Sequence, residues 1–528
     1  MRMLSIVGGM VVGLVAVPVV APGEAVAADS GGGEEKRGQV IYNLDCTQYF
    51  MGSFGPIVPE TIDKFVEEHA AAGITDLWIN VNAQRTNYRS DVWEAFWDGY
   101  DPAAGTDQPF FSGMLPRRID GPDANDAAWF ISMYKLHDQG CDYPQRMLES
   151  ARRNRLGAWL SMRMNDGHHP ELPNHPGHST IWKTHPEWWL TSGYGLDYEQ
   201  EEVREHHLKL VRELCERYDI DGLELDFQRF WLYFRPGREH QGAKLMLDFM
   251  EQARAATRGA AQRLGHPVKL AVRVPGNPWT ARRHGLDAVA WARAGLVDLI
   301  VAGSFWFSTN SDIPVETWKG QLIGTGVEVA VHLEDGINSG ASGRRTMTPD
   351  EMRGLLISAV HRGADAVYLF NLFTGPYQRW PREEHDRLIS DAGSYDALRA
   401  APRRHVLTIT DPWSKGEAGS HASLPYTGKH GTFRLYTGPK PSPKQETQVE
   451  LIVPDNQTLE VRMNGISCPG SVLVEPTHIK ASGLELEMEM EPRQAFRVPP
   501  EAMSDGYNLI EVLSAQEATI KWVEISVR

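Results

Sequence analysis

The fold is decided by residues 221–228, which read DGLELDFQ. Apolar and polar side chains alternate in this segment, and a period of two is typical of a β-strand whose two faces meet different surroundings. Two leucines and a phenylalanine form one face, and the other carries Glu224, Asp226 and Gln228. The apolar face fits packing against helices, and the polar face fits the interior of a barrel.

Short apolar segments of this kind occur eight times between residues 38 and 402, with longer helical patterns among them. The predicted strands are residues 40–46, 76–82, 158–165, 222–228, 269–274, 297–305, 327–334 and 366–373. The helical patterns include residues 59–72, 201–217, 243–263, 286–294 and 349–362. This alternation predicts an α/β fold, a (β/α)8 TIM barrel, over residues 38–402. The alternative, a doubly wound open sheet, usually shows a glycine-rich phosphate-binding turn.

The rest of the chain divides into three parts. Residues 1–27 combine Arg2, an apolar run and small residues before a cleavage point, which predicts a signal peptide and a secreted or periplasmic protein. An uncleaved membrane anchor is the alternative. Residues 28–37 predict a flexible lead-in. Residues 403–528 predict a C-terminal all-β sandwich, with strands such as 432–437, 449–453, 459–463, 484–490 and 520–527.

Composition excludes some classes of function. The 528 residues include 53 Lys and Arg against 69 Asp and Glu, and the net charge of −16 argues against nucleic-acid binding. No segment after the signal peptide predicts a membrane span. The four cysteines lack metal-ligand spacing and leave the pairing of any disulfide open, although Cys215 fits a buried helical position. The oligomeric state is not set by the sequence.

Polar residues occupy the inward positions of six predicted strands toward their carboxyl ends, where TIM-barrel active sites lie. They are Asn43, Asp45, Asn80, Asn82, Ser161, Arg163, Asn165, Glu224, Asp226, Gln228, Arg273, His332 and Glu334. Burying such groups without hydrogen bonds is costly, so a whole ring of them indicates a site. A structural alternative for part of the ring is an ion pair of Arg163 or Arg273 with Glu224.

Cleavage of a glycosidic bond needs two carboxyl groups, one of which protonates the leaving oxygen. Asp226 and Glu334, at the ends of the fourth and seventh strands, are the best-placed pair. Competing carboxyl groups are Asp335, Glu224, Asp45 and Asp166. The residues expected to contact the glycan are Asn80, Asn82, Arg85, Arg163, Asn165, Asp166, His168, Glu224, Arg229, Arg273, Trp306 and His332.

Histidines and aromatic residues gather in the predicted mouth loops. Residues 165–169 (NDGHH) could bind sugar hydroxyls, act as an acid or hold a metal, but no second cluster has metal-ligand spacing, so we predict no metal and no cofactor. The chain has 16 Trp residues, and aromatic rings stack on the C–H faces of sugars. The mouth-loop aromatics are Trp93, Trp97, Trp188, Trp189, Tyr194, Trp306 and Trp380.

Four segments carry a resemblance to a known family: residues 185–189 (HPEWW), 196–198 (LDY), 203–204 (VR) and 217–230 (RYDIDGLELDFQRF). Together they resemble bacterial glycosyl-hydrolase-like 10 barrels. The resemblance implies a secreted carbohydrate-active barrel and gives Asp226 and Arg229 as the matched positions, without implying a particular reaction. The chain departs from the family at Tyr198, where a proline is usual. It is also similar to the chitinase strand pattern, but Gln228 replaces the catalytic glutamate, which disfavours a chitinase mechanism.

These features predict an exported glycoside hydrolase whose partner is a polysaccharide or oligosaccharide. A non-catalytic glycan-binding barrel is the main alternative. A polysaccharide lyase, which needs a base and a neutralising group for uronic acids, is the third.

Overall fold

The computed structural model describes residues 38–51, 56–115, 125–190, 193–230, 232–338, 344–374, 378–408, 424–453, 457–474, 478–479, 488–489 and 491–528. The predicted signal peptide, the lead-in and most of the predicted strand 484–490 lie outside these residues. Within the described ranges, no helix is both long enough and apolar enough to cross a membrane.

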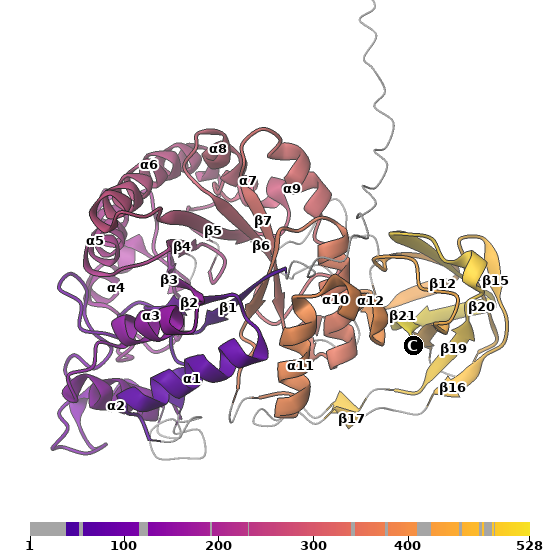
Figure 1. Cartoon of the computed structure of the whole chain (residues 1–528), viewed down its shortest axis with the longest axis horizontal. Coiled ribbons are helices and arrows are strands. Elements are labelled where there is room, and N and C mark those ends of the chain that lie inside the picture. Colours follow the sequence, from indigo (N-terminus) through magenta and orange to yellow (C-terminus); the bar gives the residue numbers. More distant parts are fainter. Residues whose placement is uncertain are drawn as a thin grey trace, which may run out of the picture. The chain divides into compact units, whose positions relative to one another are not determined.

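Eight parallel strands close into a barrel in the order β1-β10-β7-β6-β5-β4-β3-β2 (Figure 1). The strands are β1 (Gln39–Leu44), β2 (Asp76–Asn80), β3 (Gly157–Arg163), β4 (Gly222–Asp226), β5 (Lys269–Pro275), β6 (Leu299–Gly303), β7 (Glu328–Glu334) and β10 (Ala366–Phe370). Each overlaps one predicted strand, so the predicted barrel is confirmed. A short hairpin of β8 (Gly336–Asn338) and β9 (Arg344–Thr346), which the sequence did not predict, follows β7.

Helices lie around the barrel (Figure 1). They are α1 (Pro59–Ala72), α2 (Asn125–Asp138), α3 (Tyr143–Arg153), α4 (Thr180–Thr184), α5 (Glu201–Arg217), α6 (Glu239–Leu264), α7 (Pro278–Arg283), α8 (Ala288–Arg293), α9 (Val315–Gln321), α10 (Pro349–His361), α11 (Arg382–Ala392) and α12 (Tyr395–Ala400). Local sequence sets their ends. In α10, Thr348 accepts a hydrogen bond from the Glu351 backbone, and the Glu351 carboxylate accepts one from Thr348 N at 2.7 Å, which forms a capping box. Helix α1 ends at Gly73, whose φ of 108° favours glycine.

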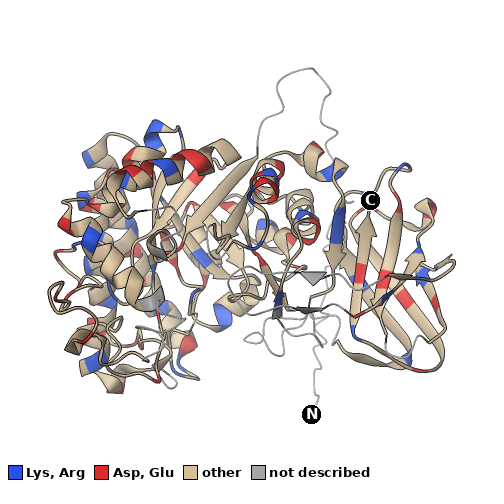
Figure 2. Ribbon diagram, turned by 90° about the horizontal axis from the view of Figure 1, so that it is seen from below, with Lys and Arg blue, Asp and Glu red and all other residues tan. Residues whose placement is uncertain are grey.

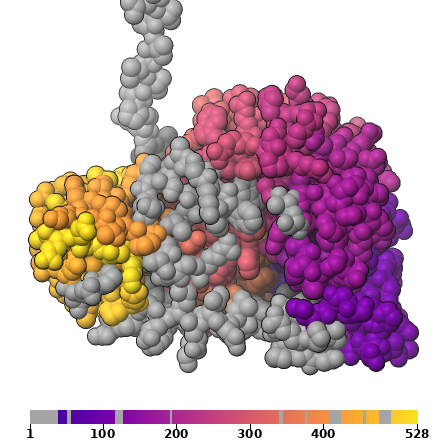
Figure 3. Space-filling view, turned by 180° about the vertical axis from the view of Figure 1, so that it is seen from behind, coloured from indigo at the N-terminus to yellow at the C-terminus, as the bar shows by residue number. Residues whose placement is uncertain are grey.

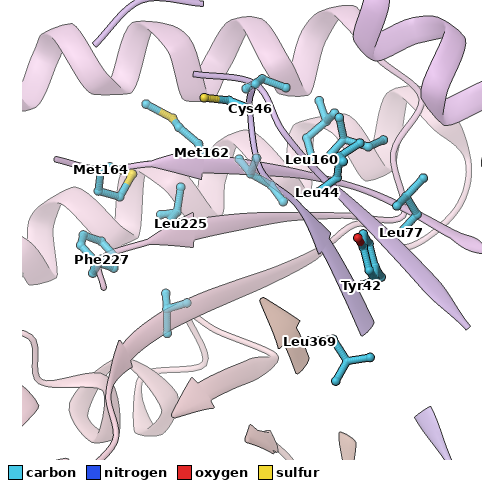
Figure 4. Close-up of a cluster of buried hydrophobic side chains, with 14 of the residues drawn as sticks. Tyr42, Leu44, Cys46, Leu77, Leu160, Met162, Met164, Leu225, Phe227 and Leu369 are labelled. Atoms are coloured by element: carbon cyan, nitrogen blue, oxygen red, sulfur yellow. The ribbon is translucent and has the colours of Figure 1, made fainter. Parts of the chain in front are cut away.

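The outward faces of the strands form the main core with the helices. Figure 4 shows apolar side chains of neighbouring strands in this layer, among them Tyr42, Leu77, Leu160, Leu225 and Leu369. Lys, Arg, Asp and Glu lie mainly on the helices and loops, with both signs interspersed (Figure 2). The alternation read from the sequence therefore separates the helix-facing residues from the inward ones.

The barrel interior has an apolar floor. Trp78 and Trp159 stack there with ring centroids 4.4 Å apart and an interplanar angle of 14°. They pack with Ile41, Ala271, Leu299, Val301, Ala330, Ala366, Tyr368 and Phe370. The inward polar residues lie further along the strands than this apolar layer. They are therefore near the carboxyl ends, where the candidate site forms.

The C-terminal part is a β-sandwich, as predicted. One sheet has the order β11 (Arg403–Val406), β21 (Trp522–Val527), β13 (Thr447–Ile452), β19 (Arg493–Arg497) and β16 (Val472–Val474). The other has the order β12 (Tyr426–Tyr436), β20 (Tyr507–Ile520), β14 (Leu459–Met463) and β15 (Ile466–Cys468). A two-stranded ladder pairs β17 (His478–Ile479) with β18 (Met488–Glu489). Figure 3 shows orange and yellow atoms, which belong to the C-terminal part of the chain, gathered at the left of the face in view.

An arginine connects the barrel helices to the sandwich. The Arg362 guanidinium lies 3.9 Å from the ring centroid of Tyr436 and 4.9 Å from that of Tyr507. It also forms ion pairs with Asp312 and Glu316 of the barrel domain. The Arg362 side chain, which is 2% exposed, therefore contacts the sandwich through cation–π interactions and the barrel domain through ion pairs.

Candidate active site

Asp226, the last residue of β4, forms a buried ion pair with Arg273 of β5. Arg273 Nε donates to Oδ1 at 2.9 Å and Nη2 donates to Oδ2 at 2.7 Å, and neither side chain is more than 2% exposed. The Gln228 backbone N–H also donates to Oδ1, at 2.9 Å. Oδ1 therefore accepts two hydrogen bonds, whereas Oδ2 accepts one from the described residues. The geometry leaves the second lone pair of Oδ2 as the one that can act on a ligand.

Glu334, the last residue of β7, lies two strands further around the barrel from β5. Its Oε2 accepts a hydrogen bond from the Phe307 backbone N–H at 2.6 Å, and Oε1 accepts one from Asn371 Nδ2 at 3.1 Å. Burial, with the negative charge of Asp335, raises the pKa of Glu334 to about 7, although these hydrogen bonds oppose the shift. A carboxyl group that exchanges its proton near neutral pH suits general acid catalysis.

Glu224 lies below Asp226 on the same strand and is fully buried. Its Oε2 accepts hydrogen bonds from the Tyr368 hydroxyl at 3.0 Å and from Asn43 Nδ2 at 3.4 Å. Burial, with the negative charge of Asp226, raises the pKa of Glu224 to about 8. Glu224 is therefore neutral at pH 7 and is held by interior residues, which favours a supporting position over direct catalysis.

Arg163 of β3 starts a chain of polar contacts across the mouth. It forms ion pairs with Asp45 and, at 3.2 Å, with Asp166. Asp166 Oδ1 lies 2.8 Å from His168 Nδ1, and His168 Nε2 lies 3.0 Å from Arg229 Nη2. Since an arginine can only donate, Nε2 is the acceptor and Nδ1 carries the proton.

The two carboxyl groups of this chain are ionised. Burial alone would raise the pKa of Asp45, but Arg163 and Arg229 hold it below its ordinary value. Burial acts in the same sense on Asp166, but His168 and Arg163 hold its pKa well below the usual range. Neither group suits the role of the acid. The interpretation that Arg163 or Arg273 pairs with Glu224 is wrong, because each arginine has a closer carboxylate on a neighbouring strand or loop.

Three of the predicted glycan-binding residues hold neighbouring backbone. Asn82 donates to the Arg163 carbonyl at 3.0 Å and accepts from its N–H at 3.1 Å, which extends the pairing of β2 and β3. Arg85 donates to two loop carbonyls, at 3.0 and 3.1 Å. Asn165 donates to the Leu196 carbonyl at 3.1 Å. These contacts fix the loops that surround the mouth.

The remaining predicted binding residues lie in the interior or at its rim. Asn80 donates to the Ser161 carbonyl at 3.3 Å, and its Oδ1 has no partner among the described residues. His332 is 1% exposed, and burial, together with the charge of Arg273, lowers its pKa well below the ordinary value. A neutral His332 therefore lies beside the polar layer.

Aromatic residues at the mouth differ in burial, and Trp188 and Trp189 are half-buried against the core. Trp93, Trp97 and Trp380 are at most 6% exposed and belong to the core. Trp306, after β6, is 44% exposed and Tyr194 is 41% exposed, so both can contact a sugar. Trp279, 53% exposed after β5, was not predicted, although its place just beyond a predicted strand was a usable signal.

The histidines of the loop after β3 pack against aromatic rings and each other. His169 and His175 have ring centroids 4.2 Å apart, and His178 lies 3.8 Å from Trp182. Over the ranges listed above, no group of three or more His, Cys, Asp or Glu side chains could hold a metal ion. Cys215 is buried in α5, as predicted, and all four cysteines are free.

Neither a family model nor a curated protein sequence matches this chain. Among solved structures it is similar to alpha-L-fucosidase isoenzyme 2 from Paenibacillus thiaminolyticus, with a TM-score of 0.41 and 11% identity over 70% of this chain and 51% of that chain. It is similar to the GH36 alpha-galactosidase AgaA from Geobacillus stearothermophilus, with a TM-score of 0.38 and 12% identity over 91% and 56%. It is also similar to the maltogenic alpha-amylase AmyB from Thermotoga neapolitana, with a TM-score of 0.36 and 11% identity over 90% and 98%. The chain spans about half the length of the fucosidase and the galactosidase.

Proposed function

We propose that this protein is a glycoside hydrolase that cleaves glycosidic bonds of a polysaccharide or oligosaccharide. The observation that carries the proposal is the pair of buried carboxyl groups at the carboxyl ends of β4 and β7. Asp226 lies in a bidentate pair with Arg273, and the pKa of Glu334 is raised to about 7. Two carboxyl groups in such different environments fit the division of labour between nucleophile or base and acid.

In the proposed reaction, the Glu334 proton passes to the glycosidic oxygen as the bond from that oxygen to the anomeric carbon breaks. Asp226 Oδ2 either attacks the anomeric carbon or removes a proton from an attacking water. Water supplies the hydroxyl group of the new reducing end, and Glu334 regains its proton in the course of the cycle. The predicted signal peptide, residues 1–27, supports action on a glycan outside the cytoplasm.

The test incubates the purified protein with a panel of glycans. Each reaction is measured for new reducing ends and for the ultraviolet absorbance of an unsaturated uronate. We expect new reducing ends from at least one glycan, and a loss of about 100-fold or more in Asp226→Asn and Glu334→Gln. Asp197→Asn is the matched control, because Asp197 is a buried carboxylate whose partner, Arg235, is 51% exposed and lies outside the interior ring.

Two results would overturn the proposal. Glycan binding with no new reducing ends would indicate a non-catalytic binding barrel. Products with the ultraviolet absorbance of an unsaturated uronate would indicate a lyase instead.

A further inference from the structure

Arg229, just past β4, carries a cation at the mouth that is attracted by Asp45, Asp166 and Glu334 but forms no ion pair with any described carboxylate. Its Nη2 donates to His168 Nε2 at 3.0 Å. Within the part of the chain that the structure describes, it has no carboxylate oxygen within 4.0 Å, and its buried Nε has no hydrogen-bond partner. An arginine that is half-buried and bound only to an imidazole is left with unused donors.

Three other arginines of the mouth differ from Arg229 in this respect, and Arg85 uses its donors on two loop carbonyls. Arg163 has ion pairs with two carboxylates, Arg273 has a bidentate pair, and Arg379 has Asp335 at 3.1 Å. These three cations are compensated by the protein itself. Among Arg229 and these three arginines, Arg229 alone has no ion pair with a residue that the structure describes, so its donors can meet an anion from outside.

The acceptor for Arg229 is a neutral ring. Burial lowers the pKa of His168, and the attraction of Asp166 only partly offsets that effect. Burial and the nearby positive charge of Arg163 also lower the pKa of Arg229, against the attraction of Asp45, Asp166 and Glu334. The chain from Asp166 through His168 therefore orients the guanidinium without cancelling its charge.

The surroundings of the guanidinium are aromatic. Phe230 meets the edge of His168 with centroids 5.1 Å apart, and Tyr194 lies nearly parallel to Phe230 at 6.4 Å. The Phe370 ring lies 6.0 Å from the Arg229 carbon Cζ. A ligand here meets a cation beside apolar ring faces, which fits a sugar ring that carries an anionic group.

We propose that Arg229 binds the carboxylate or sulfate group of an acidic sugar, so that the substrate is an acidic glycan. This inference rests on the proposed function for its site, but recognition of the acidic group can be measured separately from cleavage.

The experiment is calorimetric titration of the full chain carrying Glu334→Gln, which limits turnover. The probes are tetrasaccharides from polygalacturonate, alginate and hyaluronan, each with its carboxyl-reduced counterpart, and a sulfated carrageenan tetrasaccharide with its desulfated counterpart. We expect at least one acidic probe to bind about 10- to 100-fold more tightly than its neutral counterpart. The carboxylate and sulfate pairs show which group is recognised.

Variants separate recognition of charge from general damage. Adding Arg229→Gln should remove the preference for the acidic probe, and Arg229→Lys should retain part of it. Arg235→Gln is the matched control, because it removes the same charge from the same loop while Arg235 already pairs with Asp197 at 3.0 Å. We expect it to leave the preference unchanged.

The inference is overturned if neutral counterparts bind as tightly, if Arg229→Gln weakens both members of a pair equally, or if no acidic probe binds at about 10 mM. If an acidic probe binds through Arg229 but the wild-type protein releases no reducing ends from it, the inference stands and the hydrolase proposal fails. If the wild-type protein cleaves only neutral glycans, and Arg229→Gln cleaves them equally well, the hydrolase proposal stands and the inference about Arg229 fails.

Discussion

The substitution Asp226→Asn is expected to destabilise the fold as well as to stop catalysis. The amide replaces one carboxylate oxygen by an N–H group, which then faces the donors of Arg273. Arg273 is 1% exposed, so its charge is left in the interior with no compensating partner at hydrogen-bond distance. Removing one member of a buried ion pair costs about 3–5 kcal/mol in the free energy of unfolding.

Glu224→Gln is the internal comparison, because it changes a buried carboxyl group two positions away on the same strand. The pKa of Glu224 is raised to about 8 in the folded protein. At pH 7 the unfolded chain therefore releases this proton and the folded chain keeps it, so the acid contributes less stability at pH 7 than at pH 4. An amide is neutral in both states and removes this cost, so Glu224→Gln should be at least as stable as the wild type at pH 7.

Equilibrium urea unfolding at pH 7, followed by tryptophan fluorescence, measures both variants. An Asp226→Asn protein with an unchanged m-value and a clearly lower urea midpoint supports the reasoning. Two results would refute it: a change under about 1 kcal/mol in Asp226→Asn, or an equal loss in Glu224→Gln. Restored stability in the double variant Asp226→Leu/Arg273→Met would confirm that the unpaired charge causes the loss.

Three further predictions test other parts of the molecule. Activity should fall as the pH rises through about 7, because the acid Glu334 then loses its proton; a pH–rate profile with no alkaline loss there would contradict this. Trp306→Ala should weaken glycan binding about 3- to 10-fold in a titration while leaving the urea midpoint unchanged, because the side chain is 44% exposed. Arg362→Ala should lower the free energy of unfolding by about 2–3 kcal/mol, because it removes the cation between Tyr436 and Tyr507 and its ion pairs; an unchanged urea midpoint and protease sensitivity would refute this.

The barrel could be predicted because strand alternation is a local property of the sequence. Residues 221–228 put Glu224 and Asp226 inward, and both lie inward in the structure. Helix ends with strong local signals were also predictable: Pro59 and Gly73 bound α1, and its predicted range 59–72 matches the structure. The short hairpin of β8 and β9 was not predictable, since three-residue strands carry too little periodicity.

The partners of the charged residues could not be predicted, because they depend on the register between strands. Asp226 and Arg273 are in register on adjacent strands, while Glu224 is opposite Ala271. A shift of two residues would have given the Arg273–Glu224 pair that the sequence also allowed. The loop contacts of Arg85 and Asn165 depend on how long loops fold back, which periodicity does not describe.

This dependence on register sets the division of roles among the carboxyl groups. The same burial acts on Glu224, Asp226 and Glu334, yet only Asp226 has an arginine directly opposite it in the sheet. Glu334 is opposite Phe370, which supplies no charge, so burial and Asp335 raise its pKa to about 7. The positions of the arginines thus separate a carboxylate with an ion-pair partner, Asp226, from the proton donor Glu334. Arg229 attracts Glu334 at longer range but forms no ion pair with either among the described residues. Arg163, Arg273 and Arg379 are held by carboxylates and Arg85 by carbonyls, so the Arg229 guanidinium is the feature most able to select a substrate.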